Sequence, residues 1–156
     1  MLTASAAECL SCGKTYSRMK RQRIYLESYD WDISVYYDSV ADDAPGIMRD
    51  LSDAGCDEEN LRRSHRSLTD GGFNSGLTYS NARDRRSIMV IGRTSSLAQF
   101  LDTFSHELTH LCQHICQEYG INPWSEEIAY LAGELARRMH PVLSRFMCGC
   151  GVNYER

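Results

Sequence analysis

The clearest hydrophobic pattern in the chain runs over residues 96–120. Apolar side chains recur there every three or four residues, which places them along one face of an α-helix. They are Leu97, Phe100, Leu101, Phe104, Leu108, Leu111 and Ile115. Ser96 with Gln99 three positions later is typical of a capping box at a helix start, and Gly120 is typical of a helix end. The sequence therefore predicts one long amphipathic helix.

A second amphipathic helix is predicted after Gly120. Either Asn122, which precedes Pro123, or Ser125 can cap it. Its apolar face consists of Ile128, Leu131, Ala132, Leu135 and Met139. We expect this helix to pack against the first one, so that a carboxylate in its first turn, at Glu126, can face back toward the first helix.

The part of the chain before residue 93 predicts strands. Residues 23–38 alternate partly between apolar and polar and end in aromatic and β-branched side chains, which predicts one strand or two, with residues 33–37 the most certain. Residues 87–92 form an unbroken apolar run that is typical of a buried strand. Residues 77–80 are fewer, more polar and flanked by turns, which is typical of an edge strand.

These elements predict a single α+β domain. Helical pieces at 44–54 and 58–68 interrupt a mainly sheet-forming region at 23–92, and the helix pair follows at 96–140. Residues 1–20 and 141–156 are terminal segments that contain Cys-x-x-Cys and Cys-x-Cys. At 156 residues the chain has the size of one domain, so we expect a small mixed sheet packed on the first long helix.

The first long helix carries the sequence His-Glu-Leu-Thr-His at positions 106–110. Residues four apart project from the same face of a helix, so His106 and His110 can bind one metal ion. Glu107 lies about 100° further round the helix, which suits contact with a metal-bound water better than ligation. The pattern predicts two metal ligands and a base.

Other side chains of the same helix are predicted to have no metal role. His114 continues the row but is rotated by about 80° from His106 at the helical period, so we do not expect it to be a ligand. Cys112 and Cys116 are interpreted as small core residues.

The third metal ligand is expected outside this helix. Catalytic zinc usually has three protein ligands, and the third ligand that joins such a pair is a later histidine or a glutamate. The version with a tight turn needs Gly at position 113 and His at position 116, where this chain has Gln113 and Cys116. That version is therefore disfavoured.

With Glu126, Ala129 and Tyr130 on the second helix, the chain resembles the glutamate-zincins, metallopeptidases in which two histidines of a HExxH helix and a glutamate of a following helix hold zinc. It is most similar to small single-domain members in bacterial genomes, phages and mobile elements. The resemblance implies a minimal zincin-like fold and makes Glu126 the third zinc ligand, with Glu127 as the alternative. The chain departs from the large members in its shorter spacing after His110, and from many members in carrying tyrosine four residues after the ligand.

The resemblance also suggests two further roles. Tyr130 would lie on the metal face, where its hydroxyl could orient a histidine ring or stabilise an oxyanion; the alternative is a tyrosine half-buried between the helices. In this family the strand before the active-site helix pairs with an extended substrate. The candidate substrate-binding residues are accordingly Leu77, Thr78, Tyr79 and Ser80, and an ordinary hairpin arm is the alternative.

Charge and composition exclude some classes of function. The formal net charge is −4, with acidic and basic residues interspersed, so no basic surface indicates a nucleic-acid partner. No segment approaches the length of a membrane span, and the N-terminus lacks a basic head before a long apolar core. We therefore expect no membrane association and a cytoplasmic location. The composition does not indicate an oligomeric state.

The chain has seven cysteines, an odd number that favours thiols or metal ligands over disulfides in the absence of an export signal. Cys9 and Cys12 resemble half of a zinc knuckle, and Cys148 and Cys150 supply two more thiols. A structural zinc held by these four would tie the ends of the chain together. The alternative is that the terminal cysteines bind nothing.

The predicted function is zinc-dependent hydrolysis of a peptide or protein substrate. Zinc would activate a water molecule, and Glu107 would take its proton. One alternative is a zinc-binding interaction module that hydrolyses nothing, although metal binding alone does not require a carboxylate at position 107. Another is a DNA-associated or regulatory peptidase acting on a bound partner protein, for which the terminal cysteines are the only indication.

Overall fold

The computed structural model describes residues 7–8, 15–16, 20–70 and 76–146. Its main element is a mixed four-stranded sheet whose strands are β3 (Lys20–Leu26), β4 (Trp31–Ser39), β5 (Gly76–Asn81) and β6 (Arg86–Gly92). The strand order is β3-β4-β6-β5, with β4 and β6 parallel and the other two pairs antiparallel. A short antiparallel pair, β1 (Ala7–Glu8) and β2 (Thr15–Tyr16), precedes this sheet.

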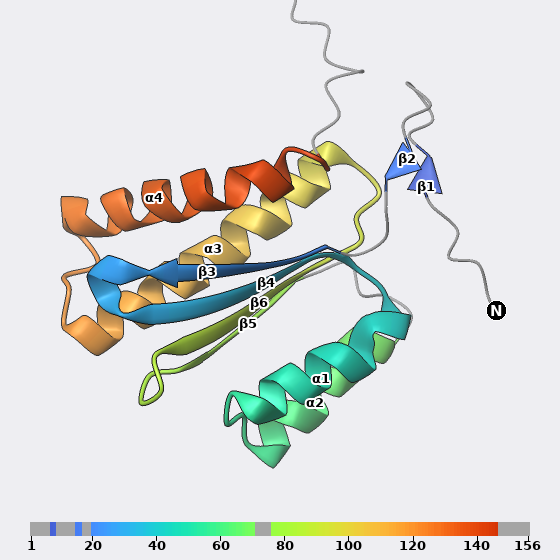
Figure 1. The fold of residues 1–156 in the computed structure, drawn as a ribbon, viewed down its shortest axis with the longest axis horizontal. Coiled ribbons are helices and arrows are strands. Elements are labelled where there is room, and N and C mark those ends of the chain that lie inside the picture. Colours follow the sequence, from blue (N-terminus) through green and yellow to red (C-terminus); the bar gives the residue numbers. More distant parts are fainter. Residues whose placement is uncertain (1–6, 9–14, 17–19, 71–75, 147–156) are drawn as a thin grey trace, which may run out of the picture.

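Helices cover both faces of the sheet, as Figure 1 shows. One face packs on α3 (Leu97–Tyr119) and α4 (Glu126–Leu143), and the other on α1 (Ala44–Asp53) and α2 (Glu58–Thr69). Short 3₁₀ helices lie at Glu27–Tyr29 and Ala41–Asp43. The predicted α+β class is confirmed. Within the described ranges, no helix combines the length and apolar character needed to cross a membrane.

The alternation of side chains along the strands divides the interior into two cores. On β4, Ile33, Val35 and Tyr37 face α3 and α4, whereas Tyr36 packs toward α1 and α2. On β6, Met89 belongs to the first core, and its neighbours on either side belong to the second. Because β6 is buried on both faces, it has the unbroken apolar run that predicted a buried strand.

The strand predicted over residues 23–38 is an antiparallel hairpin of two strands. The chain reverses through the 3₁₀ turn after Leu26, and Asp30 adopts a left-handed conformation with φ of 46° before Trp31 begins β4. Aspartate tolerates this conformation better than most residues. The reversal contains no glycine or proline, which is why the sequence pattern did not fix it.

The ends of α3 follow the prediction, with one difference. Ser96 Oγ accepts a hydrogen bond from the Gln99 N–H, and Gly120 ends the helix with φ of 63°. The side chain of Gln99 accepts from the N–H of Ser95, not from that of Ser96. The reciprocal half of the predicted capping box is therefore displaced by one residue.

The start of α4 is also close to the prediction. Ser125 is the residue before the first turn, but its side chain caps no helical N–H and instead donates to the carbonyl of Asn122. Leu131, Leu135 and Met139 are buried, as their spacing predicts. The apolar face of α4 joins the core shared by α3 and the sheet.

Candidate functional site

The paired histidines lie on the exposed face of α3. Their ring centroids are 4.7 Å apart, and the Nε2 atoms of His106 and His110 are 3.0 Å apart. Two nitrogen ligands at zinc bond lengths of about 2.0–2.1 Å in a tetrahedral arrangement would lie about 3.3 Å from each other. The pair is thus close to the arrangement that two positions of one zinc ion require.

Glu107 is held between α3 and the edge strand β5. Its side chain is only 4% exposed, and Oε2 accepts a 2.7 Å hydrogen bond from Thr78 Oγ1. A Cβ atom at Gly76 would come within 2.2 Å of Glu107 Cγ, so the glycine makes room for this carboxylate. Burial of a carboxylate is costly unless it is hydrogen-bonded, and Thr78 supplies that bond.

His114 is joined to the same strand. Its Nδ1 lies 2.8 Å from Ser80 Oγ, and burial, together with His110, lowers its pKa. Ser80 Oγ contacts Ser87 Oγ at 2.7 Å, and Ser87 Oγ accepts from Trp31 Nε1 at 2.8 Å. The sequence indicated the row of histidines but not this connection. Serine inside the apolar run of β6 was the available signal.

The side of α3 that bears Glu107 and His114 is called here the β5 flank. The rings of His110 and His114 stack with centroids 6.2 Å apart, so His110 adjoins this flank. The side of α3 that faces α4 is called the α4 flank. It carries Cys112 and Cys116, which lie in the core with the apolar face of α4.

The α4 helix is anchored at the opposite edge of the sheet from β5. Gln22 of β3 donates to the Arg138 carbonyl at 2.8 Å, and Arg138 forms a 2.6 Å ion pair with Glu27 just after β3. Because β3 and β5 are the two edges of the sheet, α4 and the histidine row lie on different sides of α3.

The predicted glutamate ligands lie in the first turn of α4, and their part in the ligand set stays a prediction. Glu126 and Glu127 are both exposed in the first turn of α4, and Glu127 instead lies near enough to Cys116 to contribute, after burial, to a raised thiol pKa. Among the described residues, no three His, Cys, Asp or Glu side chains form a group that could hold a metal ion. The third ligand of His106 and His110 therefore stays a prediction.

Tyr130 is 75% exposed, so it is not the half-buried tyrosine of the alternative interpretation. Its catalytic role stays a prediction. The four terminal cysteines of the predicted structural zinc are Cys9, Cys12, Cys148 and Cys150, and all lie outside the described residues.

The thiols of α3 behave as the core residues that the sequence predicted. Cys112 and Cys116 are 1% and 2% exposed. Burial, reinforced by the neighbouring Cys116, raises the pKa of Cys112 to about 12. The high pKa and the burial both fit a small core residue in the apolar interior.

The edge strand β5 uses its side chains within the molecule. Leu77 and Tyr79 pack against the core under α1 and α2, whereas Thr78 and Ser80 point to α3. Within the described part of the chain, β5 pairs only with β6. Its outer main-chain groups are those of a sheet edge, and its substrate role stays a prediction.

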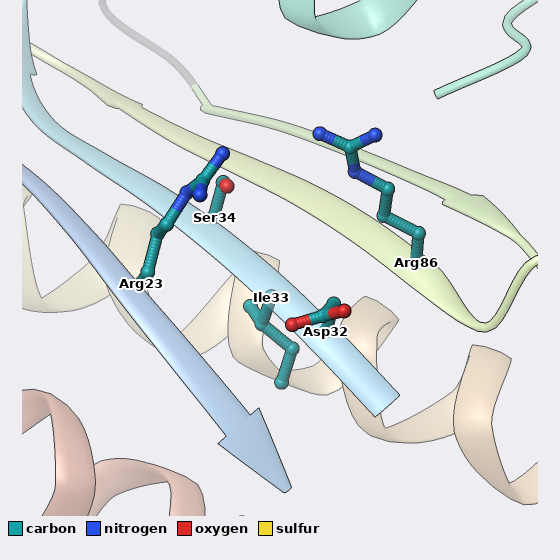
Figure 2. Close-up of a pocket in the computed structure, with 5 residues that line it drawn as sticks. All are labelled: Arg23, Asp32, Ile33, Ser34 and Arg86. Atoms are coloured by element: carbon teal, nitrogen blue, oxygen red, sulfur yellow. The ribbon is translucent and has the colours of Figure 1, made fainter. Parts of the chain in front are cut away.

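A polar hollow of 280 Å³ lies on the other face of the sheet, as Figure 2 shows. It is lined by Arg23, Asp32, Ile33, Ser34 and Arg86. The register pairs Arg23 with Ser34 and Asp32 with Arg86 across three adjacent strands, on the face that also carries α1 and α2. The hollow is therefore separated from the histidines by the sheet.

The β5 flank and the exposed face beside it combine an imidazole pair, a buried carboxylate and a sheet edge. These are groups that can bind a metal, accept a proton and align an extended chain. A scan against protein-family models and searches of curated proteins and of solved structures found no match to this chain.

Proposed function

We propose that this protein is a zinc-dependent peptide hydrolase with a minimal zincin-like fold. The observation that carries the proposal is the position of Glu107 between the imidazole pair and the edge strand, where Thr78 holds its carboxylate. Zinc binding alone would need no carboxyl group there, and a purely structural position would not favour a buried polar group of this kind.

The residues that would hold zinc are His106 and His110, whose Nε2 atoms are already 3.0 Å apart. When bound, zinc would supply a Lewis acid and a water of lowered pKa. Glu126 stays the predicted third ligand on the resemblance alone.

Glu107 would act as the proton acceptor. Oε2 is occupied by Thr78, whereas Oε1 accepts no hydrogen bond from any described residue and is available to take a proton. The same carboxyl group would then pass the proton to the leaving amine. Thr78 would keep the carboxylate oriented during both transfers.

The outer edge of β5 would hold the substrate. An extended peptide can pair with an exposed strand through main-chain hydrogen bonds. Because Thr78 and Ser80 are bonded to α3, a peptide on this edge would run alongside the row that contains Glu107 and the histidines.

The test is hydrolysis of a library of short unstructured peptides by the zinc-loaded protein. Glu107→Gln should lower the rate by about 10²–10⁴-fold, the usual contribution of a general base, while zinc content stays unchanged. Glu118→Gln, an exposed change on the same helix, is the matched control and should leave the rate unaltered. Equal rates in the Glu107 variant and the wild type would refute the proposal.

A zinc-binding interaction module is the second candidate. It is favoured by the lack of a third ligand beside the histidine pair among the described residues. Zinc binding without hydrolysis of any peptide in the library would support this candidate over the enzyme.

A further inference from the structure

A chain of hydrogen bonds runs from Trp31 through Ser87 and Ser80 to His114. Among the described residues, only one choice of donors and acceptors gives every hydroxyl proton in this chain an acceptor. The indole N–H of Trp31 can only donate, so Ser87 Oγ accepts the 2.8 Å bond between them. Ser87 is 0% exposed, and its only other side-chain partner among the described residues is Ser80 Oγ at 2.7 Å. A buried hydroxyl proton without an acceptor is costly, so Ser87 must donate to Ser80.

The same reasoning determines which nitrogen of the His114 imidazole carries the proton. Ser80 Oγ accepts from Ser87 and has one other partner, His114 Nδ1 at 2.8 Å. If Ser80 donates to this atom, Nδ1 carries the lone pair, and the neutral ring has its proton on Nε2. In the opposite direction, with Nδ1–H donating, Ser80 Oγ would accept from both neighbours, and its own hydroxyl proton would have no acceptor among the described residues.

This tautomer distinguishes His114 from the two histidines before it. A ring that binds zinc through Nε2 usually donates its Nδ1 proton to a neighbouring acceptor. His114 Nδ1 instead accepts, and its half-buried Nε2–H donates to no described residue. The ring of His114 is stacked on that of His110, so the Nε2–H donor belongs to the residue that follows the proposed zinc ligands in the histidine row.

We propose that His114 is a fixed N–H donor, not a metal ligand, and that it binds a main-chain carbonyl oxygen of a peptide lying along β5. The peptide contact rests on the proposed function. The assignment of the ring proton to Nε2 does not. Glu107 is anchored by Thr78 and His114 by Ser80, two residues further along the strand. Thr78 and Ser80 are one repeat of an extended chain apart, about 6.6–6.8 Å, so a peptide paired with β5 that places its scissile carbonyl near Glu107 would present an equivalent carbonyl further along, toward the His114 N–H.

The state of the ring is tested without substrate by ¹⁵N NMR of the zinc-free protein at neutral pH. The expected result is an Nε2-protonated His114 whose Nδ1 signal shifts in Ser80→Ala. Ser39→Ala is the matched control, because Ser39 is a buried strand serine whose Oγ has no hydrogen-bond partner in the described structure. A ring protonated on Nδ1 would overturn the proposal.

The role of the donor is tested with His114→Phe and His114→Asn, of which only asparagine keeps an N–H. Zinc content should equal that of the wild type in both. For the peptide library, the phenylalanine variant should raise KM about tenfold with kcat unchanged, as loss of one substrate hydrogen bond predicts, and asparagine should restore part of this. Loss of zinc from either variant, or an unchanged KM in His114→Phe, would overturn the proposal.

Failure of this proposal can be distinguished from failure of the proposed function. If the wild type cleaves no peptide, the proposed function fails, and the peptide contact of His114 fails with it. The NMR and zinc measurements still decide whether His114 is a fixed donor or a ligand, because neither depends on hydrolysis.

Discussion

The two flanks of α3 have the same helical backbone but opposite chemistry. On the β5 flank, Glu107 and His114 are hydrogen-bonded to Thr78 and Ser80 of the edge strand. On the α4 flank, the side chains of the helix are packed in an apolar core. The β5 flank of α3 therefore contributes side chains to the candidate site, and the α4 flank contributes side chains to the hydrophobic core.

This difference bears on the third ligand, which the sequence places in the first turn of α4. The first turn of α4 follows α3 closely in sequence, and the pattern predicts that a carboxylate there can face the histidines. The sheet, however, places α4 over β3 and leaves β5 beside the histidine row. A third ligand from α4 would have to cross from one flank to the other.

The largest expected effect is on zinc binding. His106→Ala and His110→Ala should bind no zinc after dialysis, because each removes one of the paired imidazoles. Metal analysis of Glu126→Ala and Glu127→Ala then decides whether α4 supplies the predicted third ligand, because wild-type zinc content in both variants would exclude it. Loss of zinc in Glu126→Ala alone would break the comparison and support the ligand set that the resemblance implies.

A smaller effect is expected from Leu135→Ala on the α4 flank. Leu135 is 0% exposed in the core, so the substitution should lower the free energy of unfolding by about 2–5 kcal/mol in urea titrations. Zinc content per folded chain should not change. Arg137→Ala, an exposed change on the same helix, should stay within about 0.5 kcal/mol of the wild type.

The smallest effects on stability come from two glycines, one in β5 and one in α4. Gly76→Ala would place a Cβ 2.2 Å from Glu107 Cγ, so we expect a destabilisation of about 1–3 kcal/mol and a loss of peptide hydrolysis. Gly133→Ala on α4 meets nothing within 4 Å and should stabilise the protein by up to about 1 kcal/mol. Equal effects in thermal or urea unfolding would contradict the proposed close packing of Glu107 on β5.

Much of the fold was predictable because its signals are local. The period of the apolar residues gave α3 and the apolar face of α4, and Ser96 and Gly120 marked the ends of α3. The β3–β4 reversal was less certain, since Asp30 reaches its left-handed conformation without a glycine or proline beside it.

The candidate site was predictable only in part. Residues four apart on a helix must share a face, so the pairing of His106 with His110 followed from spacing. The partner of Glu107 did not, because Thr78 is 29 residues away along the chain. The connection of His114 likewise depends on Ser80, 34 residues earlier.

By itself, the sequence determined the helices, most of the strands and the presence of a metal-binding pattern, since these depend on periodicity and capping within a few residues. Only the tertiary structure decided which flank of α3 meets β5 and which meets α4. The physical reason is that this choice depends on the order of strands in the sheet and on contacts as distant as Trp31 with Ser87, 56 residues apart. No local pattern encodes those pairings.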